Sequence, residues 1–99
     1  MRDPEIMSQV KDILAKISKI APGRAVELRI PPYSAIQCIE GPKHTRGTPP
    51  NVVEMSADVL FDISTGKINW TSAISDGRIS ASGERSDLSA LFQQLSAAE

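Results

Sequence analysis

The sequence is poor in the residues that most catalytic and metal sites use. It has one cysteine, one histidine and an aromatic fraction of only 4% over 99 positions. The single cysteine, Cys38, cannot form an internal disulfide, so the fold does not depend on oxidation. With so few aromatic residues, the core must be built mainly from aliphatic side chains. The formal net charge of -1 gives no global attraction to nucleic acid or to an anionic membrane.

Long apolar runs are also missing. No run approaches the roughly 18 residues that would indicate a membrane span, so we expect no integral membrane association. The chain opens on charged residues and a proline, which argues against a signal peptide. We therefore expect a cytoplasmic protein that forms a single domain over residues 1–99, a length typical of one domain.

The first half of the sequence predicts a helix and two strands. Asp3 is a predicted N-cap, and Pro4 stands at the first helical position, where its missing N–H costs nothing. Apolar residues then recur at the helical period up to Ile20. From residue 24 the period changes to two, which predicts strands over residues 24–30 and 33–39 joined by a hairpin.

The second half alternates strands with short helices. A strand is expected over residues 51–55 and another over 78–82, with a last helix starting at residues 86–87. Ser56 and Asn69 are predicted to cap two short helices between them. Gly66 and Gly77 end these helices, where a residue free to take positive φ is favoured.

Read together with its residues, this order resembles the sterol-carrier-protein-2 family. Members have a strand, a short helix ending in Thr-Gly-Lys, another short helix, and then Gly-basic-aliphatic-x-x-x-Gly before the closing helix. Here these motifs are residues 65–67 and 77–83, and the match covers residues 52–95. Residues 40–51, which contain three of the seven prolines and glycines at 41 and 47, resemble the small actinobacterial branch of bacterial sterol-carrier orthologues.

The element order predicts an α+β fold with a mainly antiparallel sheet of four to five strands and helices packed on one face. The resemblance implies a non-enzymatic carrier or binder of lipid-like apolar ligands of the sterol or fatty-acyl class. The alternative is an accessory protein-interaction module of the same fold that binds no lipid. Larger members carry more chain after the position of Leu95 that helps enclose the ligand. We therefore expect a shallow groove, or a pocket completed by a homodimer.

Apolar residues of the second half are the candidates for a ligand site. They form either an ordinary hydrophobic core or a core that opens to hold a lipid. The candidates are Phe61, Trp70, Ile74, Leu91 and Leu95.

The glycine- and proline-rich loop supplies candidate polar contacts. Lys43, His44 and Arg46 could hold a carboxylate or phosphate through charge-assisted hydrogen bonds. The alternative is a solvated loop in which Arg46 pairs with Glu40 or Glu54. Such exposed ion pairs contribute little to stability and imply no ligand.

No motif points to catalysis or to a metal. His44 forms no metal-ligand pattern with Cys38 or Glu40. Cys38 lies in a strand-like run, where a buried and inert thiol is common. We therefore expect no catalytic residue, no metal, no cofactor and no nucleic-acid partner.

Overall fold

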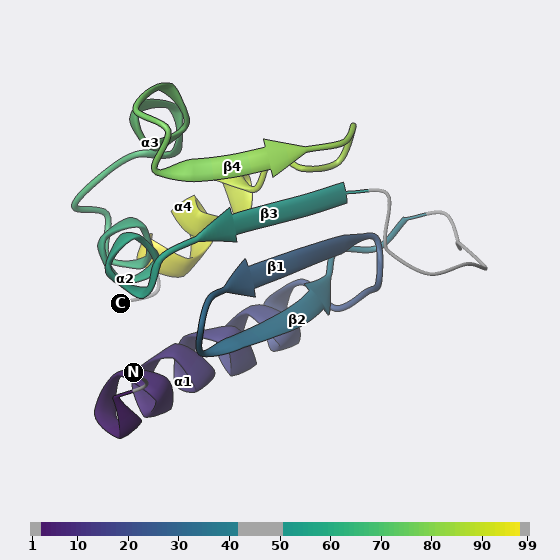
Figure 1. Cartoon of the computed structure of the whole chain (residues 1–99). Helices are drawn as coiled ribbons and strands as arrows, with labels where there is room; N and C mark the ends of the chain where they lie inside the picture. Colours follow the sequence, from purple (N-terminus) through teal and green to yellow (C-terminus); the bar gives the residue numbers. More distant parts are fainter. Residues whose placement is uncertain (1–2, 42–50, 98–99) are drawn as a thin grey trace.

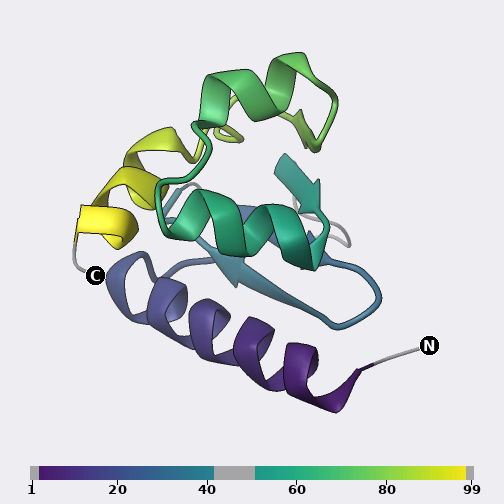
Figure 2. The ribbon, with the colours of Figure 1, turned by 90° about the vertical axis from the view of Figure 1, so that its left-hand side faces the viewer.

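The chain forms a mixed sheet with helices on one face, as Figures 1 and 2 show. The computed structural model describes residues 3–41 and 51–97. Within these residues the elements are, in chain order, α1 (Pro4–Ile20), β1 (Val26–Ile30), β2 (Ser34–Cys38), β3 (Asn51–Met55), α2 (Ala57–Ser64), α3 (Trp70–Ser75), β4 (Ile79–Ser82) and α4 (Ser89–Ala97). The predicted α+β class is confirmed.

The strand order of the sheet is β2-β1-β3-β4. β1 and β2 form the predicted antiparallel hairpin, and β3 pairs antiparallel with β4. Between these pairs, β1 and β3 run parallel, with Leu28 opposite Val53. Because β1 and β3 begin at the same end of the sheet, Val26 lies beside Asn51. The sheet is thus mainly antiparallel but mixed, with its parallel pair at the centre.

The two faces of the sheet differ in polarity, as expected for strands of period two. Val26, Leu28 and Ile30 are fully buried and face the helices. Between them, Glu27 and Arg29 project from the opposite face, where Arg29 Nη2 lies 2.9 Å from Glu27 Oε1. This ion pair is partly exposed, so it contributes little to stability.

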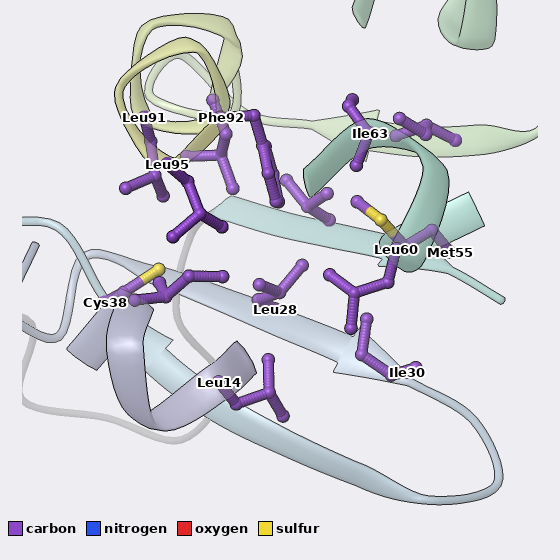
Figure 3. Packing of buried hydrophobic residues seen from close by; sticks show 14 of the residues in the cluster. Leu14, Leu28, Ile30, Cys38, Met55, Leu60, Ile63, Leu91, Phe92 and Leu95 are labelled. Carbon is purple, nitrogen blue, oxygen red and sulfur yellow. The ribbon is translucent and has the colours of Figure 1, made fainter. Parts of the chain in front are cut away.

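The core lies between the inner face of the sheet and the helices. Figure 3 shows Leu14 of α1, Leu28 of β1 and Leu60 of α2 converging on it. All three are at most 2% exposed. Phe92 of α4 is the one buried aromatic residue among those described, so the core is aliphatic as the composition predicts.

The predicted helix caps are confirmed. Asp3 accepts a hydrogen bond from the Glu5 amide at 2.9 Å, and Asn69 accepts one from the Ser72 amide at 2.8 Å. Ser56 does the same for Val59 at 3.3 Å. Such caps satisfy amides that have no partner within the helix.

The last helix begins later than the sequence predicts. The prediction placed its start at residues 86–87, whereas α4 begins at Ser89. The Ser86 hydroxyl donates to the Gly83 carbonyl at 2.8 Å, which keeps this segment in a turn. Asp87 accepts from the Ser89 amide at 2.9 Å, and hydrogen bonds from the Ser89 side chain and backbone lower the pKa of the Asp87 carboxyl.

Candidate functional site

Three helices enclose a groove of about 370 Å³. It lies where α2 contacts both α1 and α4. Its volume falls within the range of small-molecule pockets, about 300–1,000 Å³. The groove is lined by Gln9, Asp12, Ile13, Lys16, Phe61, Ser64, Thr65 and Leu95.

Each of the three helices gives the groove one apolar wall. Ile13 comes from α1, Phe61 from α2 and Leu95 from α4. Ile13 and Phe61 are half-buried and pack against the core, and Leu95 is 7% exposed. The groove is thus an extension of the hydrophobic core toward the surface.

Polar side chains of α1 lie along one side of the groove. Gln9, Asp12 and Lys16 are three and four positions apart, so they share one face of the helix. All three are exposed. Across residues 3–41 and 51–97, Lys16 forms no salt bridge. Its ammonium group is therefore available to a ligand at the rim.

Ser64 is the most unusual residue of the groove. It is the last residue of α2 and only 3% exposed, yet its Oγ has no hydrogen-bond partner. The adjacent Thr65 hydroxyl donates to the carbonyls of Phe61 and Asp62, at 3.0 and 3.3 Å. Since the large majority of buried polar side chains are hydrogen-bonded, Ser64 is an exception that needs an explanation.

A second hollow of about 340 Å³ lies between the connection from α2 to α3 and α4. Trp70 and Phe92 are on its wall, with ring centroids 6.1 Å apart and planes 20° from parallel. One face of the Trp70 indole is covered by Phe92, so the main role of this side chain is to pack against α4.

The five apolar candidates from the sequence do not come together in one cavity. Phe61 and Leu95 line the groove of α1, α2 and α4, whereas Trp70 lines the second hollow. Leu91 belongs to the core at 7% exposure, and Ile74 is exposed at 37%. Ile74 lies outward because the six-residue helix α3 buries Ala73 instead.

The polar candidates Lys43, His44 and Arg46 lie outside the described residues, and their anion-binding role stays a prediction. Arg29 pairs with Glu27 on the open face of the sheet.

Sequence reasoning missed Ile13, Lys16 and Ser64 as groove residues. The helical period places Ile13 in the apolar stripe of the first helix but does not separate it from the buried residues Val10, Leu14 and Ile17, beside which it is only partly buried. Ser64 left a signal, since it stands four residues after Leu60 and so shares its buried face. A hydroxyl at an apolar helix position marks a buried polar group.

Cys38 is fully buried, and burial raises the pKa of its thiol to about 11. The thiolate is the nucleophilic form, so this thiol is inert at neutral pH. No three His, Cys, Asp or Glu side chains of the described residues gather into a group that could hold a metal ion. In the same residues, no helix is long and apolar enough to cross a membrane.

This arrangement of sheet, helices and groove defines a sterol-carrier-protein-2-like domain. The family described as bacterial SCP ortholog matches residues 2–93, and the chain belongs to this family. The resemblance seen in the sequence is thus confirmed. Its more specific part, the actinobacterial branch, stays a prediction.

A solved structure described as "UbiJ-SCP2 Ubiquinone synthesis protein" has the same fold. The match has a TM-score of 0.56 and 14% sequence identity, and covers 99% of this chain and 95% of that one. At this identity the likeness concerns the fold alone. No curated protein matches the chain at a significant level.

Proposed function

We propose that this protein binds and carries a lipid-like apolar ligand in the groove of α1, α2 and α4. The observation that carries the proposal is the groove itself, which has an apolar wall from each helix and about 370 Å³ of space. Membership of a bacterial SCP family supports the same class of ligand. Within the class named by the sequence, sterol or fatty-acyl, we favour a fatty-acyl chain because Lys16 stands at the rim, where it can pair with a carboxylate.

Burial of apolar surface would drive binding. Each Å² removed from water contributes about 25 cal/mol, so a chain burying about 300 Å² gains roughly 7 kcal/mol. Ordering of the chain and loss of free motion subtract from this value. Since a micromolar dissociation constant corresponds to about 8 kcal/mol, we expect micromolar affinity or weaker. Such weak binding suits a carrier, which must also release its ligand.

The proposal is for a non-enzymatic protein of the cytoplasm. The buried Cys38, with its raised pKa, supports a structural thiol rather than a catalytic one. The fold needs no disulfide, which is consistent with a reducing compartment.

The first experiment is native mass spectrometry of the freshly purified protein, followed by titration with dodecanoate and ¹H–¹⁵N chemical-shift mapping. We expect retained lipid, and shifts that centre on Ile13, Phe61, Ser64 and Leu95. A clean mass without ligand, together with unchanged spectra, would contradict the carrier and favour the protein-interaction module.

A matched pair of variants on α1 tests the place of binding. Ile13→Trp fills the groove and should weaken dodecanoate binding at least tenfold. Ile20→Trp adds the same ring to the same helix outside the groove, where Ile20 is already 39% exposed, and should bind as the parent does. Equal affinities for the two variants would place the ligand elsewhere.

A further inference from the structure

The second hollow, between α4 and the connection from α2 to α3, has a lining without charge. All the described residues that form its walls are apolar, glycine, or neutral amides and hydroxyls. Lys67 lies between two lining residues in the sequence but does not itself line the hollow. A charged group that enters the hollow loses hydration and meets no opposite charge there. The lining therefore favours an uncharged ligand.

Three residues of this lining carry neutral hydrogen-bond donors that have no partner among the described residues. They are the side-chain amides of Asn69 and Gln93 and the indole N–H of Trp70. The oxygen of Asn69 accepts from the Ser72 amide at 2.8 Å, which holds the side chain in one orientation and leaves its NH₂ group unused. Asn69 and Gln93 are exposed, and the Trp70 nitrogen is not buried, so a ligand can reach all three donors.

The apolar part of the hollow limits the shape of its ligand. Ile63 and Phe92 are 3% and 2% exposed, whereas Ile68 and Trp70 are half-buried. Phe92 stacks on the indole and so holds this ring in place. The faces of an aromatic ring carry partial negative charge, so they attract the slightly positive carbon-bound hydrogens of a sugar. A pyranose combines such hydrogens with uncharged hydroxyls that both donate and accept.

We propose that the second hollow is a binding site for a neutral sugar ring, separate from the groove of α1, α2 and α4. Its volume of about 340 Å³ is at the lower end of the range for small-molecule pockets, which suits a single ring. Trp70 and Ile68 contact the carbon-bound hydrogens, and Asn69 and Gln93 bond the hydroxyls. A ligand with about twelve non-hydrogen atoms and ordinary efficiency has a dissociation constant of a few millimolar.

The experiment titrates the full chain with methyl β-D-glucopyranoside and follows ¹H–¹⁵N signals of side chains. In this sugar every ring substituent is equatorial, so carbon-bound hydrogens cover both faces of the ring. We expect the signals of the Trp70 indole and of the Asn69 and Gln93 amides to shift, with a dissociation constant of a few millimolar. Methyl β-D-glucuronide, the same ring with a carboxylate, should bind about threefold or more weakly, because the lining offers it no cation.

Two adjacent glutamines of α4 provide a matched pair of variants. Gln93→Ala removes an amide that lines the hollow, and Gln94→Ala removes the same group at a position that does not. Both positions are exposed and alanine favours helices, so both variants should fold. Read from the Trp70 indole signal, Gln93→Ala should weaken sugar binding about five- to tenfold, the loss of one hydrogen bond, and Gln94→Ala should bind as the parent does.

Asn69→Ser tests the second amide donor. Serine also caps helices, so this variant should keep the thermal midpoint close to that of the parent while it loses the NH₂ group. We expect sugar binding to weaken about five- to tenfold, as in Gln93→Ala. Unchanged binding would show that the Asn69 amide does not contact the sugar and would contradict the proposed arrangement.

Other outcomes would overturn the proposal outright. One is an unshifted Trp70 indole signal with the sugar at roughly ten times the expected dissociation constant. Another is equal weakening in Gln93→Ala and Gln94→Ala, which would place the sugar elsewhere. Equal or tighter binding of the glucuronide would show that the neutral lining does not select the ligand. None of these results affects the proposed lipid carrier, which depends on the separate titration with dodecanoate.

Discussion

The buried side-chain amide of Asn51 donates a hydrogen bond to the Ala25 carbonyl at 2.8 Å. Its oxygen accepts from the Arg85 amide at 2.9 Å, so a residue that is 4% exposed is bonded at both ends. Asn51 begins β3, next to the start of β1 and close to the turn before α4. One side chain thus joins three segments that are distant in the sequence.

Replacing Asn51 should therefore lower stability markedly. Asn51→Ala leaves the Ala25 carbonyl and the Arg85 amide without partners, and we expect a loss of about 2–4 kcal/mol in urea unfolding. Asn51→Asp is the informative control, because its carboxylate can accept from Arg85 but cannot donate to Ala25. It should be destabilised at pH 7. A loss below about 0.5 kcal/mol for Asn51→Ala would show that water replaces both bonds.

Two glycines with positive φ should differ sharply in their tolerance of alanine. Gly23 has a φ of 145°, and an added Cβ would collide with the Ile39 carbonyl. That carbonyl is fixed, because it accepts from the Ala25 amide at 3.0 Å. Gly77 has a φ of 75°, but no atom lies within 4 Å of an added Cβ.

We expect Gly77→Ala to cost about 1–2 kcal/mol, the strain of a left-handed alanine. Gly23→Ala should cost more than about 3 kcal/mol or prevent folding. Equal thermal midpoints for the two variants would contradict the collision.

The buried thiol predicts a loss of stability at high pH. The pKa of Cys38 is raised from an ordinary 9.0 to about 11, so between these values the folded state holds a proton that the unfolded state releases. The stabilisation from the protonated thiol is fully present below pH 9 and is lost as pH rises through 11. Two pKa units correspond to roughly 2–3 kcal/mol. Other groups titrate in this range, so the measurement is the difference between the parent and Cys38→Ala in urea unfolding from pH 8 to 11.5. If the free energy of unfolding changed with pH in the same way in both proteins, the thiol would not be buried in solution.

Local features of this fold could be predicted from the sequence, and non-local ones could not. The caps at Asp3, Ser56 and Asn69 depend on a few neighbouring residues, so the helix starts they mark are confirmed. The parallel pairing of β1 with β3 brings Val26 beside Asn51, two residues far apart in the sequence, and no local pattern encodes this pairing.

The groove, too, could be predicted from the sequence only in part. Helical spacing was enough to single out Phe61 and Leu95 as apolar candidates. That Ile13 of α1 lies opposite them depends on how α1 packs on α2, a contact between segments far apart in the sequence. The missing partner of Ser64 likewise becomes visible only when every neighbouring donor and acceptor is placed.

The sole tryptophan, Trp70, can report which hollow holds the ligand. It lines the second hollow and stacks on Phe92, but it does not line the groove of α1, α2 and α4. Dodecanoate bound in that groove should therefore leave the wavelength of maximum Trp70 emission unchanged at saturation. Phe92→Leu is the positive control, since it removes the stacked ring. It should shift the emission to the red and lower stability by about 1 kcal/mol beyond the lost burial.

A blue shift of the parent protein on adding dodecanoate would mean that apolar atoms cover the indole. The ligand would then lie in the second hollow, and Ile13→Trp should no longer weaken its binding.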